Sequence, residues 1–279
     1  MTRFPAARVP VCFAVLTLLV LGGVPGRPSG VAQVPTATRQ AAGPAAQPAA
    51  RLMSVREPVL ATATATASAA HYAFISRAGH PAAPIARWNP CSGPIGYRVN
   101  LARAPRGALA DVQGAVERIS AATGLRFRYL GTTSVVPSST DSGPAYPAGT
   151  SIVVAWARPG QSRMLPEARS GAARPLAMGG GSWVTGRVDA RGRVWGQFVE
   201  GAVVVDATQY PEPGFGRAQR GTRGRMLMHE LGHVVGLGHV GDPAQVMYPV
   251  DSGAAVWGAG DRTGLRVLGA ASGCLYAPR

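Results

Sequence analysis

The chain has 279 residues and a formal net charge of +15 at pH 7, and all 28 of its basic side chains are arginine. A positive charge of this size could indicate an anionic partner, such as nucleic acid or a charged cell surface. However, the arginines are dispersed and no basic run with interleaved aromatic residues occurs, so we expect no nucleic-acid binding.

Residues 1–30 have the layout of a secretory signal peptide. Arg3 and Arg8 precede an apolar run over residues 9–21, which small and turn-forming residues follow. The run is short for a transmembrane helix, although an uncleaved N-terminal anchor is the alternative. No later stretch is long and apolar enough to span a bilayer. We therefore expect a secreted, extracellular protein with no stable membrane span in its mature form.

Without this segment the chain has two cysteines, Cys91 and Cys274. An even number of cysteines in an exported chain predicts a disulfide. The chain-entropy model assigns about 4–5 kcal/mol of stabilisation to the closure of so long a loop. Two unpaired buried thiols are the alternative, and they are less expected outside the cytosol.

Residues 31–86 are rich in Ala, Pro and Thr. They show little aliphatic periodicity and could not bury enough apolar surface to offset the entropy of ordering. We predict a linker or a propeptide over this range. His71 and His80 lie here, away from other ligands, and are expected to be solvated.

Residues 87–279 carry the pattern of one folded domain with alternating strands and helices. Apolar residues fall at helical spacing over residues 109–119, and Gly124 is suited to cap that helix. Residues 151–157 form a continuous apolar run, as expected of a strand covered on both faces. This order indicates an α/β-type sheet with a helix packed against it. The predicted strands cover residues 95–101, 125–130, 151–157, 182–188 and 200–207.

Residues 225–236 are predicted to form a helix that carries two histidines and a glutamate. His229 and His233 are four residues apart, so their Cβ atoms would lie roughly 5–6 Å apart on adjacent turns. Both imidazoles could then reach one metal ion. Glu230 would lie near that ion without binding it. This is the arrangement of a helical zinc protease, with the glutamate as general base.

The next residues supply a third histidine. Gly236 can end the helix in a left-handed conformation, and Gly238 adds freedom before His239. Three neutral imidazoles around Zn²⁺ leave a fourth position for water, whereas a structural zinc site fills all four, often with cysteine. The alternative is a set of ordinary core or surface histidines, and it weakens as more residues of a motif fall in register.

The stretch HELGHVVGLGH, residues 229–239, resembles the HExxHxxGxxH signature of the metzincins, and MYP at residues 247–249 looks like their methionine turn. Residues 239–249 are similar to the matrixin family. The resemblance implies a metzincin-like α/β (α+β) fold, with a twisted mixed sheet, an active-site helix and a C-terminal helix over residues 260–269. It also implies that Met247 lies beneath the zinc and that Met247 and Tyr248 line the specificity pocket. Tyr248 is not assigned to the metal.

One departure from the matrixins concerns latency. Their propeptide usually holds a cysteine that binds the zinc, but no cysteine lies between Cys12 and Cys91. Cys91 itself is an alternative for that role, although it precedes a core-like strand and Cys274 is a natural partner for it. Calcium is common in the family and several aspartates are available, so Ca²⁺ is a second candidate ion, but no spacing here is diagnostic of its ligands. Asp261 is placed favourably in the first turn of the closing helix.

These features predict a secreted, monomeric zinc endopeptidase in which Glu230 activates a water molecule. A protein or peptide substrate would bind in an extended form along a sheet edge, for which residues 182–188 are the expected strand. One alternative is a zinc hydrolase that acts on cell-wall peptides. Another is a non-catalytic surface-binding protein with structural zinc, against which the presence of Glu230 counts.

Overall fold

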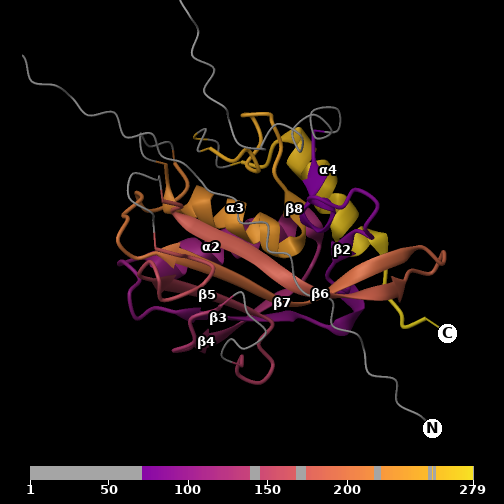
Figure 1. The fold of residues 1–279 in the computed structure, drawn as a ribbon, viewed down its shortest axis with the longest axis horizontal. Coiled ribbons are helices and arrows are strands. Elements are labelled where there is room, and N and C mark those ends of the chain that lie inside the picture. The colour runs from indigo at the N-terminus through magenta and orange to yellow at the C-terminus, as the bar shows by residue number, and fades with distance from the viewer. Residues whose placement is uncertain are drawn as a thin grey trace, which may run out of the picture.

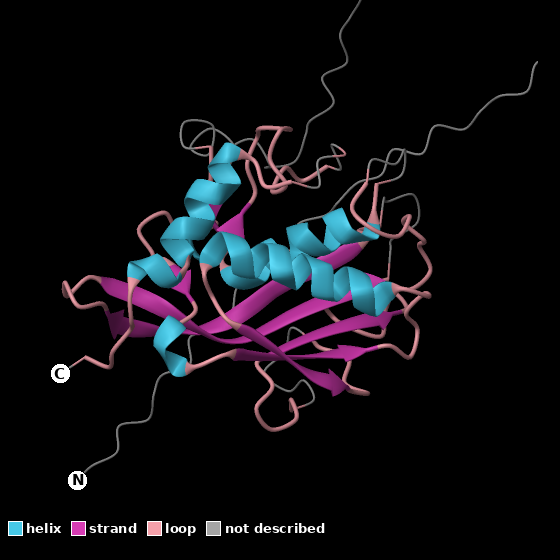
Figure 2. Cartoon of the chain, turned by 180° about the vertical axis from the view of Figure 1, so that it is seen from behind, coloured by secondary structure: helices cyan, strands magenta, loops and turns pink. Residues whose placement is uncertain are grey.

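In the computed structural model, a mostly parallel β-sheet with helices on one face organises the described part of the chain (Figures 1 and 2). The described residues are 71–138, 145–167, 174–216, 221–250, 253 and 256–278. The fold is therefore mixed α/β, as predicted. Residues 1–70, with the expected signal peptide and most of the expected propeptide, lie outside the described residues.

Four parallel strands form the centre of the sheet in the order β4-β3-β5-β7. All six residues of β5 are buried, which agrees with the continuous apolar run in the sequence. A short strand, β2, adds to β7 in parallel. The bounds of these strands are β2 Ala86–Arg87, β3 Ile95–Asn100, β4 Phe127–Thr132, β5 Ile152–Ala157 and β7 Val194–Asp206.

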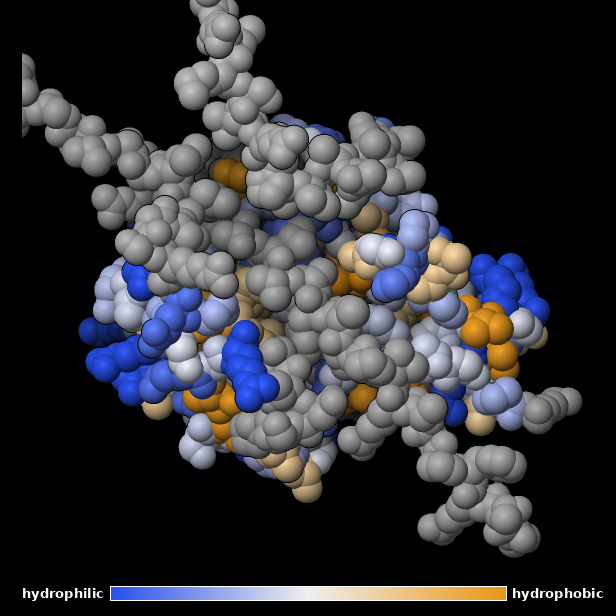
Figure 3. Space-filling view, viewed as in Figure 1, coloured by the Kyte–Doolittle hydropathy of each residue, from blue (hydrophilic) through white to orange (hydrophobic). Residues whose placement is uncertain are grey.

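The antiparallel strand β6 (Ala177–Val188) forms an edge of the sheet and pairs with β7 along almost its whole length. The sequence predicted only residues 182–188 and 200–207 as strands here, so both strands are longer than expected. They form a hairpin whose turn projects beyond the helices (Figure 1). Hydrophobic and hydrophilic surfaces lie side by side at that end, on the right of Figure 3.

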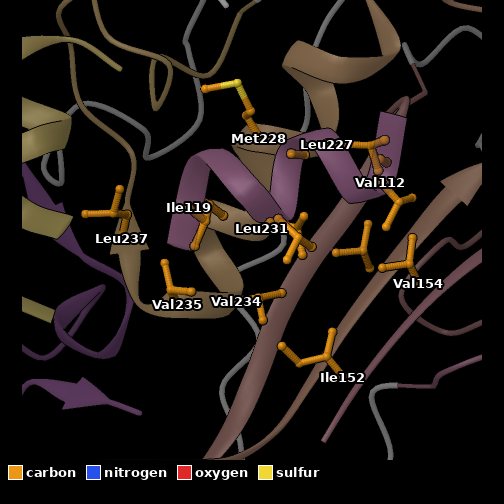
Figure 4. Packing of buried hydrophobic residues seen from close by; sticks show 14 of the residues in the cluster. Val112, Ile119, Ile152, Val154, Leu227, Met228, Leu231, Val234, Val235 and Leu237 are labelled. Atoms are coloured by element: carbon orange, nitrogen blue, oxygen red, sulfur yellow. The ribbon is translucent and has the colours of Figure 1, made fainter. Parts of the chain in front are cut away.

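Two helices, α2 (Ala108–Thr123) and α3 (Arg223–Val235), cover one face of the sheet, and α4 (Ala259–Leu268) packs beside them (Figure 2). Gly124 ends α2 in a left-handed conformation, as predicted. Leu231 and Val234 of α3 belong to the same buried cluster as Ile152 and Val154 of β5, which face them in Figure 4. The apolar stripe of α3 therefore faces the sheet, and its histidines lie on another face.

A buried ion pair fixes the start of α3 against α2. Arg223 Nε donates to Asp111 Oδ2 at 2.7 Å, and the side chain of Arg223 is 3% exposed. The other oxygen of Asp111 accepts a hydrogen bond from the backbone N–H of Gly214 at 3.1 Å. The loop before α3 and both helices are thus held together by one carboxylate.

The folded unit begins earlier than the expected boundary at residue 87. Strand β1 (Ala73–Phe74) pairs antiparallel with β8 (Leu237–Gly238), and a short 3-10 helix, Ile75–Arg77, follows it. Ile75 and Ser76 are buried. A strand of two residues is too short to show a hydrophobic period, so the sequence pattern gave no signal for it.

The predicted disulfide between Cys91 and Cys274 is present, with a Cα–Cα distance of 5.4 Å. Beside it, the side-chain amide of Asn89 donates to the carbonyl of Leu275 and its oxygen accepts from the N–H of the same residue. Cys91 is therefore not free to act as a latency cysteine in this structure. Within the described ranges, no helix is both long and apolar enough to cross a membrane.

Replacing both cysteines, as Cys91→Ser with Cys274→Ser, should lower the free energy of unfolding by about 2–5 kcal/mol, because the bond closes a loop of 183 residues' separation. Urea denaturation followed by circular dichroism measures the change. Reductant should destabilise the wild-type chain by a similar amount and leave the double variant unaffected. Equal stability of the two proteins under oxidising conditions would contradict a stabilising role for the bond.

Candidate metal centre

Helix α3 presents His229 and His233 one turn apart, and their ring centroids are 4.8 Å apart. Both side chains are buried. Each ring is held by its Nδ1 atom, which is 2.7 Å from the carbonyl oxygen of Val246 in His229 and 2.9 Å from that of Leu237 in His233. Because a carbonyl only accepts, both Nδ1 atoms carry the proton and both Nε2 atoms present a lone pair.

The chain reverses at Gly236 and brings the third histidine back to the helix. Gly236 has φ +118° and its N–H donates to the carbonyls of Gly232 and His233, which ends α3. A Cβ at this position would lie 2.9 Å from the carbonyl oxygen of Ala86. After two residues of β8, His239 follows. The predicted turn at Gly236 is therefore present, and both its backbone angle and its surroundings favour glycine.

The three imidazoles converge through their Nε2 atoms. The Nε2 of His239 lies 2.9 Å from that of His229 and 3.1 Å from that of His233. His239 is partly exposed, and its Nδ1 has no hydrogen-bond partner among the described residues. One proton on His239 Nε2 could satisfy only one of these two contacts. A cation bound by all three nitrogens would satisfy both.

The electrostatics of the group favour neutral rings. Burial, with the nearby His233, holds the pKa of His229 well below its usual range, and burial lowers the pKa of His233 to about 4. Burial and the other two rings lower the pKa of His239 as well. Neutral imidazole is the form that binds metal ions. Within the described ranges, these three side chains are the only group of three or more His, Cys, Asp or Glu residues close enough to share an ion.

Glu230, the expected general base, lies on the same helix and is 1% exposed. Neither of its carboxylate oxygens has a hydrogen-bond partner among the described residues. Burial raises the pKa of Glu230 to about 8, and the nearby backbone N–H of Gly179 opposes this only in part. A buried carboxyl group without a partner is costly for stability, so such a group commonly serves a ligand, a water molecule or an ion.

Met247 packs against helix α3 at Gly232. Its sulfur lies 2.6 Å from the place where a Cβ of Gly232 would stand, and Gly232 is between the two helical histidines. Met247 is fully buried, whereas its neighbour Tyr248 is partly exposed and donates its backbone N–H to Gln245. The methionine therefore lies close to the metal-binding group, and glycine at 232 makes room for it.

Asp261 of α4 supports this methionine-containing segment and was not expected to do so. Its Oδ2 accepts hydrogen bonds from the N–H of Val246 at 2.6 Å and of Gly258 at 3.0 Å, and its Oδ1 accepts one from Met247 at 3.4 Å. The carbonyl of the same Val246 receives the Nδ1–H of His229. Asp261 thus fixes a backbone unit that orients a predicted ligand. No spacing in the sequence could have revealed a contact made by backbone atoms.

The edge strand approaches the group at Gly179 rather than within the expected residues 182–188. A Cβ on Gly179 would lie 2.3 Å from the carbonyl oxygen of Glu230, so β6 and α3 touch backbone to backbone. The far end of the strand is paired, because Val188 exchanges backbone hydrogen bonds with Tyr276. The part of β6 beside Glu230 is therefore its first half.

No protein-family model matches this chain, and no curated protein matches it. The possible chemistry of the site is therefore inferred from its side chains alone. Their arrangement can hold one metal ion in a three-histidine site, and the residue after the first histidine, Glu230, has a buried carboxyl group with no hydrogen-bond partner among the described residues.

We expect the purified chain to bind one transition-metal ion, and His239→Ala to weaken that binding by at least about a hundredfold, since ligand loss should exceed the tenfold to hundredfold effect of outer contacts. Competition with a chromophoric chelator measures the affinity. His80→Ala is the control, because His80 is exposed and lies outside the group. Equal losses in the two variants would contradict the assignment of His239.

Asp261→Asn should lower the free energy of unfolding by about 1–3 kcal/mol, because one backbone N–H would face an amide donor. It should also weaken metal binding about tenfold to a hundredfold through Val246 and His229. The control is Asp206→Asn, a fully buried carboxylate whose hydrogen bonds go to Thr208 and Gln209. That change should affect stability but leave metal affinity unaltered. A stable Asp261→Asn variant with wild-type affinity would refute this role.

Proposed function

We propose that the chain is an exported zinc-dependent endopeptidase with a metzincin-like, matrixin-related catalytic domain. The observation that carries the proposal is the convergence of three neutral imidazoles, two of them on the helix that also carries the buried carboxyl group of Glu230. The mixed sheet with an antiparallel edge strand, the ligand-bearing helix α3 and the closing helix α4 support the metzincin-like architecture. The Cys91–Cys274 disulfide supports an oxidising, extracellular location.

His229, His233 and His239 would hold the ion. Three nitrogen ligands suit Zn²⁺ and leave a coordination position for a reactant. When bound, the ion would polarise the scissile carbonyl and lower the pKa of a water molecule. The backbone carbonyls of Val246 and Leu237 would keep the two helical imidazoles in the tautomer that binds metal.

Glu230 would perform the proton transfers. Its carboxyl group ionises more readily beside a divalent cation, which offsets the effect of burial on its pKa. The carboxylate takes a proton from water as the water oxygen bonds to the carbonyl carbon. The same proton passes to the amide nitrogen as the carbon–nitrogen bond breaks, so Glu230 returns to its starting state.

A peptide in extended form would bind along the first half of β6. This half lies beside Glu230, at Gly179, and it belongs to an edge strand whose outer backbone groups can pair with another chain. Main-chain hydrogen bonds would supply affinity for many sequences. A side chain next to the scissile bond would meet the region of Met247 and Tyr248.

Glu230→Gln should retain zinc and lose activity by about a hundredfold or more, because a positioned general base contributes about 10²–10⁴ in rate. The assay is cleavage of casein, with loss of activity on chelation and recovery on addition of zinc. Glu117→Gln, an exposed change on α2, is the matched control.

Near wild-type cleavage by Glu230→Gln would overturn the assignment of the base. Zinc-dependent release of peptides from isolated cell wall, with no cleavage of casein, would replace the endopeptidase proposal by a wall-peptide hydrolase.

A further inference from the structure

The first described residues, His71 to Ser76, lie against the segment that carries the third histidine; we call them the N-terminal clamp. Ala73 pairs with Gly238 and Phe74 with Leu237 in an antiparallel register. The N–H of Ile75 then donates to the carbonyl of Gly236 at 3.0 Å. The clamp therefore follows the chain from the end of α3 to the residue before His239.

The two residues of β8 that pair with the clamp, Leu237 and Gly238, help to position two of the three histidines. The carbonyl of Leu237 accepts the Nδ1–H of His233 at 2.9 Å, and Gly238 directly precedes His239. A shift of Leu237 and Gly238 would therefore rotate one imidazole and displace another. Strand β8 has only two residues, and the structure pairs it with β1. That pairing therefore adds to the burial of the Leu237 side chain in the core and to the hydrogen bond from the N–H of Val240 to the carbonyl of Met247, which also hold this segment.

The clamp packs closely against helix α4 at two glycines that are one turn apart. A Cβ on Gly260 would lie 1.7 Å from the carbonyl oxygen of His71, which no real contact allows. A Cβ on Gly264 would lie 3.2 Å from the Cβ of Tyr72 and 2.6 Å from the side chain of Leu237. In Figure 1 the indigo start of the described chain lies beside α4 and β8. Glycine in a helix interior weakens the helix, so its presence twice on this face points to a close partner.

The other end of the clamp is also fixed. Ile75 is buried in the main core, and the Oγ of buried Ser76 accepts a hydrogen bond from the N–H of Ala86 at 3.0 Å. The residues that follow, 77–82, are exposed. The clamp is thus anchored as part of the domain and is joined to it through an exposed turn.

We infer that the N-terminal clamp is a positioning element of the metal centre, which holds Leu237 to His239 so that the third imidazole faces the other two. Its loss lets His239 leave the group and the ion dissociate. Proteolytic processing upstream of residue 71 would preserve the clamp, whereas a cut after residue 76 would leave it held by non-covalent contacts alone. This inference rests on the three-histidine site of the proposed function, but not on the reaction performed there.

The first test is Gly260→Ala in the full chain. Alanine ordinarily favours a helix over glycine, but here it would expel the backbone of His71. The expected result is release of zinc at least about tenfold faster, measured with excess chromophoric chelator, and an altered absorption band of the Co²⁺-loaded protein. Arg266→Ala, on an exposed side of α4, is the control and should change neither. Zinc release and a Co²⁺ spectrum like those of the wild-type chain in Gly260→Ala would overturn the inference.

A second test does not depend on the folding of that variant. A specific protease site replaces exposed residues 78–82 of the full chain, and zinc release is measured before and after cleavage of the folded protein. Faster release only after the cut, with an unchanged circular dichroism spectrum, is the expected result. An unchanged rate of zinc release after separation of the N-terminal fragment overturns the positioning role of the clamp but not the metal centre. Absence of bound zinc in the uncut chain overturns the metal centre, and the clamp with it.

Discussion

The site depends on three imidazole Nε2 atoms that face one another within the protein. Each would be better solvated in water, and two of the N···N contacts are about as short as hydrogen bonds although few protons are available to them. The rings stay in place because the Nδ1 atoms of His229 and His233 donate to backbone carbonyls. A divalent cation would convert this unfavourable arrangement into a stabilising one, so metal binding and the stability of the domain should be coupled.

The carbonyls that orient the rings are themselves held by parts of the chain far away in sequence. Val246 is fixed by Asp261 of α4, and Leu237 is paired with Phe74 of β1. Two independent elements therefore control the orientation of the two helical ligands, one from each end of the domain. The disulfide and the hydrogen-bonded side chain of Asn89 keep the C-terminal tail beside the segment that leads into β3.

Features encoded over a few neighbouring residues were predictable from the sequence. The histidine spacing on α3, the turn at Gly236 and the buried strand β5 follow from local geometry and hydrophobic period. The disulfide followed from the number of cysteines. The first half of β6 was missed because its glycines have low strand propensity, although Gly179 is required there by the contact with α3. The sequence did not predict the role of Asp261 or the strand β1, because both make their contacts with backbone atoms, and such contacts leave no pattern in the order of the side chains.

Glycine at positions 179 and 232 allows helix α3 to lie unusually close to its neighbours. At Gly179 the edge strand touches α3 beside Glu230, and at Gly232 the sulfur of Met247 reaches the helix between the two histidines. Side chains at these positions would push the strand or the methionine away from the helix. Close backbone contact keeps the surroundings of Glu230 poor in water, and electrostatic interactions are stronger in such an environment. The carboxylate of Glu230 has no hydrogen-bond partner among the described residues, so it is the group here that a ligand, a water molecule or an ion would satisfy.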